Sequence, residues 1–373
     1  MSIDELIRDA VAICGVSAPT GDEGARGEFV ARMFRDLGLG VTTDSAGNVV
    51  AEIPGDDRLP CVALAAHLDT VFPDLAEIEV EERDGWLHAP GIGDNSMGVA
   101  ALVGLARDLG GDQARDGLGR VLLVATVGEE GTGDLRGARH FMTERGDEVD
   151  AFLAVEGAMR DAFVTGGVGS ERLRITVRGP GGHSWGDAGA PSAIAAASAL
   201  VLEFYALVRP ERPKTTLNVG TLHGGNSINS IAEETTLDLD LRSLDAEIVV
   251  NLRDACIDLM HDRFAGDDPL SVEWAGIGSR PAGTLDPDHP LFDHLRAARV
   301  EAGLDPADEI ASSTDANIPL SVGIPASCVG IGVGEDGHRK TERLRIDGLA
   351  EGYAAFIGSV RRIATDPDLV RRP

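Results

Sequence analysis

The chain has 373 residues, of which 43% are hydrophobic, and its acidic residues outnumber its basic ones by 62 to 33. This length exceeds what a single hydrophobic core commonly organises, so two domains are expected. The formal charge of −29 opposes binding to nucleic acid or to an anionic membrane surface, and neither is expected as a partner.

Cysteine usage and hydropathy indicate the compartment. The four cysteines are scattered without a CxxC pair, which fits a reducing environment. The N-terminal segment is acidic and amphipathic, and no apolar stretch reaches the roughly 18 residues of a transmembrane helix. We therefore expect a cytoplasmic protein.

Helical and strand-like patterns alternate up to about residue 168. Amphipathic periodicity predicts helices at 3–14, 22–37, 97–109 and 136–145, and a strand is predicted at 48–54. Short runs rich in Val, Ala and Leu lie between them and are typical of strands buried on both faces. This order predicts an α/β domain.

The pattern changes between residues 169 and 282. Strands are predicted at 171–178, 215–223, 235–242 and 270–275, and helices at 191–208 and 245–264. The resulting β-α-β-β-α-β order is ferredoxin-like. We therefore predict an inserted second domain at 169–282, which would serve as a lid or an oligomerisation surface. The first domain would then be discontinuous, formed by 1–168 and 283–373.

Four apolar runs of the first domain end in side chains that can bind a metal ion. The runs cover residues 61–70, 121–131, 151–157 and 325–338. The side chains are His67, Glu129, Glu130, Glu156 and His338. In an open α/β sheet, ligands bind at the carboxyl ends of the strands. Two imidazoles and three carboxylates at one such edge predict a metal site.

His67 and Asp69 are two residues apart, so in an extended segment both side chains point to the same side. Asp69 would then orient the imidazole of a metal-bound histidine. The alternative is a histidine satisfied at a strand end, with Asp69 capping the next turn. Asp94 precedes a strongly apolar helix, where it can be an ordinary helix cap or a carboxylate that bridges two cations.

Glu129 and Glu130 are adjacent carboxylates that follow a buried strand. They would repel each other unless a positive charge compensated them, and a metal ion would supply that charge. Because neighbouring residues point to different sides, one glutamate can bind metal while the other acts as a general base. A solvated acidic turn is the alternative.

Taken together and in this order, these residues resemble a family of two-zinc exopeptidases and amidohydrolases. That family includes peptidase T, carboxypeptidase G, aminoacylase, succinyl-diaminopimelate desuccinylase and acetylornithine deacetylase. The resemblance covers nearly the whole chain and is closest to the peptidase T-like members. It implies an α/β catalytic domain with a mixed sheet and an inserted ferredoxin-like domain for lid closure and dimerisation.

The resemblance also implies a ligand set. His67 and Glu156 would hold one zinc ion, Glu130 and His338 would hold the other, and Asp94 would bridge them. Cobalt or manganese are possible alternatives, because sites of this composition accept several metals. The residue after the bridging aspartate, which is frequently a second acid in this family, is Asn95 here.

Catalytic and substrate-binding roles follow from the same resemblance. Glu129 would act as the general base for a hydroxide shared by the two zinc ions, and Asp69 would orient His67. His183 would reach the active site of the partner subunit in a homodimer formed through the lid domain. The alternative for His183 is a turn residue that caps a helix.

Three further residues are expected to contact the substrate. Asn229 and Arg242 would bind its carboxylate or carbonyl group, although a surface ion pair is the alternative for Arg242. Thr314, in a loop with Asp315 and Asn317, would contact the peptide.

The predicted activity is metal-dependent hydrolysis of an amide bond next to a free terminus, most closely that of an aminopeptidase acting on di- and tripeptides. The alternative is an amidohydrolase, of the deacylase or carboxypeptidase G type, that acts on N-acyl amino acids. A catalytically silent binding protein would require the loss of a ligand or of the base, and all are present.

Overall fold

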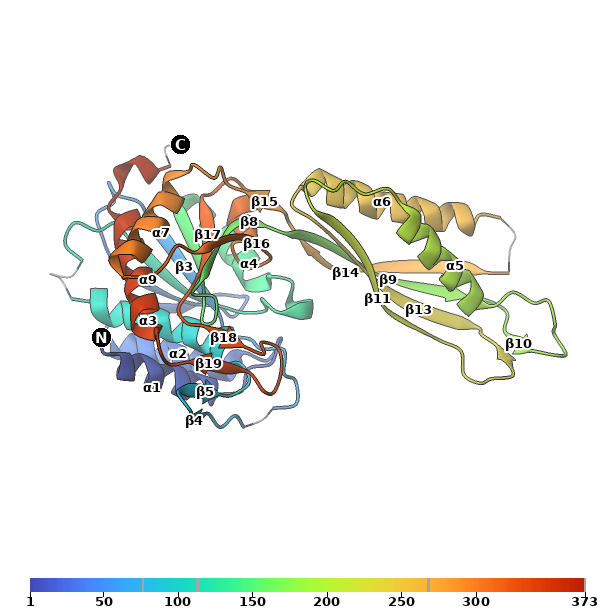
Figure 1. Cartoon of the computed structure of the whole chain (residues 1–373), viewed down its shortest axis with the longest axis horizontal. Coiled ribbons are helices and arrows are strands. Elements are labelled where there is room, and N and C mark those ends of the chain that lie inside the picture. Colours follow the sequence, from blue (N-terminus) through green and yellow to red (C-terminus); the bar gives the residue numbers. More distant parts are fainter. Residues whose placement is uncertain (76, 112–114, 267–268, 372–373) are drawn as a thin grey trace. The chain divides into compact units, whose positions relative to one another are not determined.

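The structure is a computed structural model that describes residues 1–75, 77–111, 115–266 and 269–371. The chain divides into two compact units, labelled by their elements in Figure 1. The larger unit consists of Met1–Gly167 and Thr284–Pro373, and the smaller one of Val168–Gly283. Within the described residues, no helix is long and apolar enough to cross a membrane.

The larger unit is organised by a mixed sheet that has nine strands among the described residues. The strand order is β1-β2-β6-β3-β7-β17-β8-β15, and β16 also pairs with β8. The strands are β1 (Gly40–Thr43), β2 (Val49–Ile53), β3 (Val62–His67), β6 (Val121–Thr126), β7 (Ala151–Glu156), β8 (Ala162–Gly167), β15 (Gly283–Thr284), β16 (Asp308–Ser312) and β17 (Ala326–Gly330). The predicted α/β class with a mixed sheet is confirmed.

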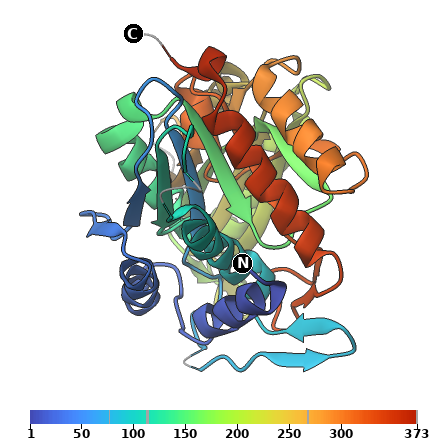
Figure 2. The ribbon, with the colours of Figure 1, turned by 90° about the vertical axis from the view of Figure 1, so that its left-hand side faces the viewer.

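Helices cover both faces of this sheet. They are α1 (Ile3–Cys14), α2 (Gly24–Asp36), α3 (Met97–Leu109), α4 (Arg136–Arg145), α7 (Pro290–Glu301), α8 (Asn317–Ser321) and α9 (Leu349–Ala364). Residues of α4 and α8 share one apolar cluster with one face of the strands, and the remaining helices share a second cluster with the other face. Helices α7 and α9 lie side by side, orange and red in Figure 2.

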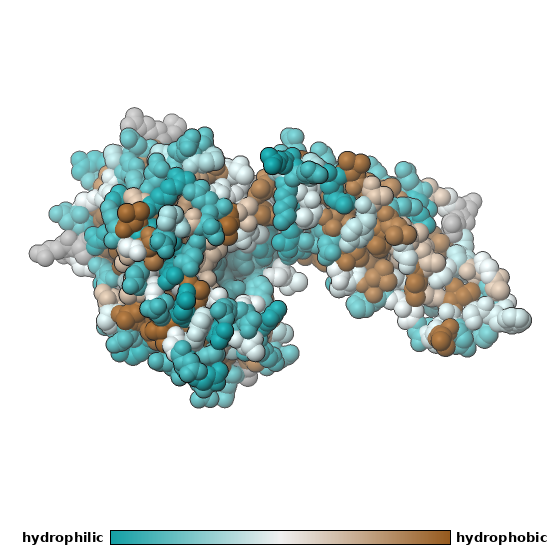
Figure 3. Space-filling model, in the orientation of Figure 1, coloured by the Kyte–Doolittle hydropathy of each residue, from teal (hydrophilic) through white to brown (hydrophobic). Residues whose placement is uncertain are grey.

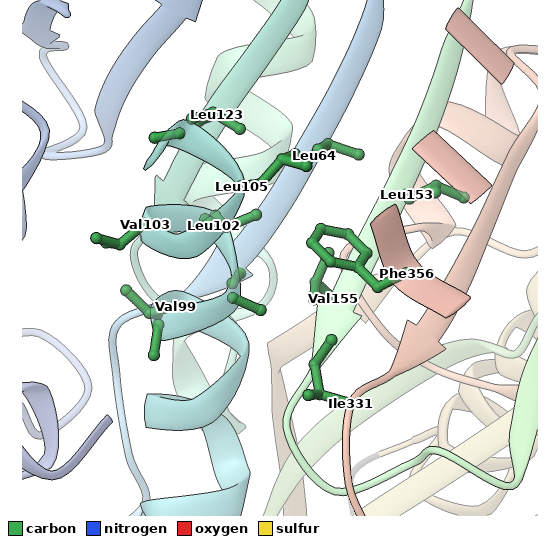
Figure 4. Close-up of a cluster of buried hydrophobic side chains, with 14 of the residues drawn as sticks. Leu64, Val99, Leu102, Val103, Leu105, Leu123, Leu153, Val155, Ile331 and Phe356 are labelled. Carbon is green, nitrogen blue, oxygen red and sulfur yellow. The ribbon is translucent and has the colours of Figure 1, made fainter. Parts of the chain in front are cut away.

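The apolar runs form strands because alternate side chains enter the two clusters. In Figure 4, Leu102 and Leu105 of α3 lie near Leu64 of β3, and Phe356 of α9 lies near Val155 of β7. Strands β3, β6 and β7 are buried along almost their whole length. Their near-continuous hydrophobicity is the pattern expected for parallel strands covered on both faces.

The central strands run parallel, so their carboxyl ends meet at one edge. Strand β3 pairs in parallel with both β6 and β7, and β7 pairs in parallel with β17. The register places His67 opposite Thr126, and Glu156 opposite Gly330. This edge therefore gathers the segments that carry the predicted metal ligands.

A small antiparallel sheet in the larger unit joins two distant segments of the chain. Its order is β18-β19-β5-β4, from β4 (Glu81–Arg83), β5 (Trp86–His88), β18 (Gly334–Glu335) and β19 (Arg343–Arg345). Arg343 of β19 lies opposite His88 of β5. The sheet thus connects the segment before Asp94 with the segment around His338.

The smaller unit has the predicted β-α-β-β-α-β order. Its main elements are β9 (Gly169–Arg178), α5 (Ala193–Ala206), β11 (Thr215–Gly224), β13 (Glu234–Ser243), α6 (Ala246–Arg263) and β14 (Ser271–Arg280). The antiparallel sheet has the order β11-β13-β9-β14, and α5 and α6 share one apolar cluster with it. A separate two-stranded ladder pairs β10 (Gly182–His183) with β12 (Ser230–Ile231). Strand β14 continues five residues beyond the predicted end at 275.

Candidate metal centre

His67 ends strand β3 and is almost completely buried. Its Nε2 atom lies 2.9 Å from Oδ1 of Asp94 and 3.7 Å from Oε2 of Glu156. Its Nδ1 atom lies 3.0 Å from the backbone carbonyl oxygen of Asp69. Burial opposes protonation, but Glu156, Asp69 and Asp94 together raise the pKa of His67 well above its ordinary value. Nε2 is the nitrogen that faces the carboxylates.

The carboxylate of Asp69 connects three segments. It accepts hydrogen bonds from the backbone N–H groups of Glu129 and Glu130, at 2.9 and 3.0 Å, and from the hydroxyl of Thr20 at 2.9 Å. Although burial opposes ionisation, the neighbouring His67 and the two backbone amides lower the pKa of Asp69 to about 2. Asp69 thereby fixes the Glu129–Glu130 turn relative to His67.

Asp94 lies in the irregular turn Ile92–Ser96 that leads into α3, and its peptide bond to Asn95 is cis. Its two carboxylate oxygens face two imidazoles. Oδ1 contacts His67, and Oδ2 lies 3.0 Å from Nε2 of His338. Burial opposes ionisation, but His338 and His67 hold the pKa of Asp94 well below its ordinary value.

His338 and Glu130 complete the other end of the cluster. Nε2 of His338 lies 2.9 Å from Oε1 of Glu130. Hydrogen bonds to Asp94 and Glu130 raise the pKa of His338 to about 10. Glu130 itself is buried, with 6% of its surface exposed.

Glu156 and Glu129 belong to the two strand ends that flank β3 at this sheet edge. Glu156 ends β7, and burial raises its pKa to about 7. Glu129 is 6% exposed and follows Gly128, whose φ of +63° lies in the left-handed region that favours glycine. The turn after β6 thus places two carboxyl groups at the sheet edge.

The donor atoms fall into overlapping groups whose members lie within 4.8 Å of one another. Two of these groups, His67–Asp94–Glu156 and Asp94–Glu130–His338, have Asp94 in common. A third group combines His67 with Glu129 and Glu130. Imidazole and carboxylate donors suit zinc, cobalt and manganese, so the residues present fit two divalent cations that share one carboxylate. The five predicted ligands are therefore brought together.

Asn95 is a residue of this centre that the sequence did not assign. It is fully buried, its side-chain nitrogen donates to the carbonyl of Val155 at 2.8 Å, and its side-chain oxygen accepts from the N–H of Gly157 at 2.9 Å. These contacts flank Glu156. A side-chain amide supplies both a donor and an acceptor, so asparagine satisfies both backbone groups at this position.

In the smaller unit, His183 and Asn229 lie on adjoining segments. His183 pairs with Ser230 in the β10–β12 ladder, and the N–H of Ser184 donates to the carbonyl of Asn229 at 3.0 Å. Nδ1 of His183 accepts from the N–H groups of Trp185 and Gly186, at 3.1 and 3.2 Å. In the neutral ring, the proton therefore resides on Nε2, which is a donor.

The other two predicted substrate contacts have partners within the chain. Arg242 donates from Nε to Asp240 at 2.7 Å and is partly exposed. Thr314 is buried, and its hydroxyl accepts from the N–H of Ala316 at 3.3 Å. Asp315 accepts from the hydroxyl of Thr126 at 2.6 Å. This loop is therefore anchored at the same sheet edge as His67, and substrate contact by Thr314 stays a prediction.

A fold with this sheet edge and this set of donors defines a class of metal-dependent hydrolases, and comparison with known proteins identifies the family. Residues 63–362 match the sequence model of Peptidase family M20/M25/M40. The chain belongs to this family and is a hydrolytic enzyme.

The relatives of this chain include peptidases and amidohydrolases. A protein of Aeropyrum pernix described as a LysW-lysine/LysW-ornithine hydrolase is 34% identical over 195 residues, which are 52% of this chain and about half (53%) of that protein. Acetylornithine deacetylase of Shigella sonnei is 28% identical over 66% of each chain. The structure of a tripeptidase of Staphylococcus aureus has the same fold, with a TM-score of 0.83 and 22% identity over 98% of this chain and 100% of that one.

Proposed function

We propose that this chain is a dinuclear metallopeptidase that removes single residues from the amino end of di- and tripeptides. The observation that carries the proposal is the placement of Asp94 between two imidazoles, 2.9 Å from His67 and 3.0 Å from His338. A carboxylate in this position can serve two cations at once, and each imidazole has a second carboxylate beside it.

In this proposal His67 and Glu156 would hold one cation, Glu130 and His338 would hold the other, and Asp94 would serve both. Zinc is the metal expected first, and cobalt and manganese have compatible donor preferences. The chemistry that two bound cations would supply is polarisation of a carbonyl group and a lowering of the pKa of a water molecule toward neutrality.

Glu129 is the proposed general base. It takes a proton from the water that attacks the scissile carbonyl carbon, and it delivers that proton to the nitrogen of the departing amine. Its backbone N–H and that of Glu130 are held by the same carboxylate of Asp69, so the base and a ligand keep a fixed relation. In this proposal Glu129 is the base and the adjacent Glu130 is a metal ligand.

His183 is proposed to stabilise the oxyanion of the tetrahedral intermediate in the active site of the partner subunit. The two N–H groups at Nδ1 leave the neutral ring with a proton on Nε2, which is the donor that an oxyanion requires. A donor of this kind typically contributes about 3–4 kcal/mol to transition-state stabilisation.

If His183 acts in the active site of a partner subunit, two copies of the chain must associate, and we propose that they do so through the smaller unit. Large apolar side chains that are 37–96% exposed lie along one side of α5 and just beyond its end, and we call them the α5 surface; they are Ile194, Leu202, Tyr205 and Val208. Brown apolar surface over α5 is visible in Figure 3. Strand β11, which packs against α5, is an edge strand of its sheet. We propose that a second copy of the chain covers both.

The proposed substrate has a free carboxylate or carbonyl group that Asn229 and Arg242 bind, and Thr314 contacts the peptide. The likeness in fold to the tripeptidase supports short peptides as the proposed substrate. A second candidate is the hydrolysis of N-acyl amino acids, favoured by the likeness to acetylornithine deacetylase. The ligands and the base serve both reactions, because both cleave an amide bond.

A substrate panel separates the two candidates. Metal-free protein would be supplied with Zn²⁺ or Co²⁺ and incubated with dipeptides, tripeptides and N-acyl amino acids, with products identified by mass spectrometry. We expect release of the amino-terminal residue from unblocked peptides. Cleavage of N-acyl amino acids alone would overturn the peptidase assignment, and no metal-dependent cleavage of either class would overturn both candidates.

A further inference from the structure

We propose that Glu342 is a positioning residue for the metal centre, which it serves by fixing the orientation of the loop that carries Asp94. The inference rests on the proposed function, because it assumes that Asp94 bridges two cations. Among the described residues, Glu342 belongs to none of the groups of candidate metal donors, and it is distinct from the proposed ligands and base.

The carboxylate of Glu342 binds the backbone of the Asp94 loop. Oε2 accepts from the N–H of Gly91 at 2.7 Å, and Oε1 accepts from the N–H groups of Gly93 and Asp94, at 2.8 and 2.9 Å. The residue is 2% exposed. Hydrogen bonds to an ionised acceptor are stronger than neutral ones, and a buried carboxylate requires them. The last of these donors is the amide of the proposed bridging residue itself.

Two glycines of the Asp94 loop, Gly91 and Gly93, allow the close approach of the Glu342 carboxylate. A Cβ atom added to Gly93 would lie 3.2 Å from Oε1 of Glu342 and 3.0 Å from Cβ of Ala158, so a larger residue would push against the carboxylate. Gly91 has a φ of +79°, a conformation that favours glycine. These two glycines allow neighbouring amides to converge on one acceptor.

Glu342 also connects the Asp94 loop with the segment that carries His338. The carbonyl of Glu342 accepts from the N–H of Ala89 at 3.1 Å, and its own N–H donates to the carbonyl of Arg339 at 3.0 Å. The β19–β5 ladder begins at the next residue, Arg343. Glu342 therefore joins the Asp94 loop to the segment that carries His338 through both its backbone and its side chain. The side chains of Asp94 and His338 contact each other between these two segments.

Asn95 holds the same loop from its other side. Its amide group bonds to Val155 and Gly157, the two neighbours of Glu156. The turn that presents Asp94 is thus fixed to the strand that carries one ligand and to the segment that carries another. Partners of a ligand typically contribute about 10–100-fold to metal affinity. Loss of the Glu342 contact leaves the Asn95 contact in place, so the turn is expected to shift rather than unfold.

The test compares Glu342→Gln with Glu335→Gln. Glutamine at 342 keeps the volume and one acceptor oxygen, but it directs an NH₂ group at a backbone N–H. Glu335 of β18 is a matched control, because it lies opposite Arg343, the residue after Glu342, and is exposed and bonds to Arg343 rather than to the Asp94 loop. Metal-free proteins would be titrated with Zn²⁺ against a chromophoric chelator and with Co²⁺ by visible absorption, with circular dichroism as a check of folding.

For Glu342→Gln we expect zinc affinity about 10–100-fold weaker than in wild type and an altered Co²⁺ spectrum, with the folded signal retained. Glu335→Gln is expected to match the wild type in both. A lower melting temperature with unchanged zinc affinity and Co²⁺ spectrum would show a merely structural role and overturn the inference. If Glu342→Gln fails to fold, Glu342→Asp is measured in the same way, because it keeps the carboxylate but draws its oxygens back from the N–H groups of Gly91, Gly93 and Asp94, with the same expected and contradicting results. Failure of the wild type to bind two equivalents would instead overturn the proposed function.

Discussion

Asp69 contacts His67 through its backbone more closely than through its side chain. The carbonyl oxygen of Asp69 lies 3.0 Å from Nδ1 of His67, whereas the carboxylate oxygen Oδ1 lies 3.6 Å away. The carboxylate instead accepts from the backbone amides of Glu129 and Glu130. The side chain of Asp69 therefore holds the proposed base and its neighbouring ligand, in addition to lying beside the imidazole.

Replacement of Asp69 by asparagine is expected to impair turnover more than metal binding at His67. The carbonyl that faces Nδ1 remains, but the new NH₂ group opposes a backbone N–H of the Glu129–Glu130 turn. We expect kcat to fall by about 10–100-fold. Steady-state kinetics together with metal analysis measures both effects. An unchanged kcat would contradict this role, and Thr20→Val, which removes a single donor to Asp69, serves as the milder control.

Replacement of Glu129 by alanine or glutamine should leave metal binding largely intact and abolish most of the turnover. A positioned general base commonly contributes about 10²–10⁴-fold to the rate. Metal content by mass spectrometry and kcat on a tripeptide would be measured on the same preparation. Turnover close to that of the wild type would exclude Glu129 as the base. Loss of a metal equivalent would make it a ligand, as the His67–Glu129–Glu130 group of donors also allows.

Metal binding is expected to release protons at neutral pH. The pKa of His338 is raised to about 10, so its imidazole is protonated at pH 7 without metal, and the neighbouring carboxylates shift the pKa of His67 in the same direction. A metal-bound imidazole must be deprotonated, so the proton of His338 leaves on binding, and the raised pKa of His67 adds to the release. Apparent affinity should consequently rise with pH until it passes the pKa of His338.

Isothermal titration in buffers of different ionisation enthalpy measures this release. The observed binding enthalpy should vary linearly with the ionisation enthalpy of the buffer. The slope at pH 7 should indicate net proton release. A slope of zero would show that neither imidazole gives up a proton on binding.

Dimerisation can be tested on the α5 surface. Glutamate at Leu202 and Tyr205 would bring charge into the proposed interface, where burial of an unpaired charge is strongly unfavourable. We expect a monomer by light scattering, with metal content retained and peptide hydrolysis lost, because His183 would no longer complete the site of a second copy. Val300→Glu, at an exposed position on α7 of the larger unit, is the control. A variant that is monomeric but fully active would contradict the role of His183.

Part of the proposed site could be predicted from the sequence because two of the proposed ligands end buried strands and Glu130 shortly follows a third. The hydrophobic runs before His67 and Glu156 predict strands, and parallel strands bring their carboxyl ends to one edge. The Glu129–Glu130 pair stands out because two adjacent carboxylates after a buried strand require an explanation. These signals are local in sequence, so they can be interpreted without knowing the packing.

The supporting contacts could not be predicted in the same way. Glu342 bonds to amides almost 250 residues away in sequence (248 for Asp94), and nothing local to it indicates that partner. Asn95 differs from the acid expected after Asp94, but its donor and acceptor roles appear only when β7 lies beside it. Substrate contact by Thr314 is implied by the family resemblance and stays a prediction, whereas the burial of Thr314 and the hydrogen bond from the N–H of Ala316 to its hydroxyl appear only in the structure.

The most direct test of the central claim is the metal stoichiometry of the wild type and of Asp94→Ala, measured by equilibrium dialysis and elemental analysis. Asp94 is the one residue that the two ligand groups share. We predict two tightly bound zinc ions per chain in the wild type and loss of at least one of them, together with peptide hydrolysis, in the variant. Two ions retained by Asp94→Ala with unchanged hydrolysis, or a wild type that hydrolyses peptides without metal, would contradict the account.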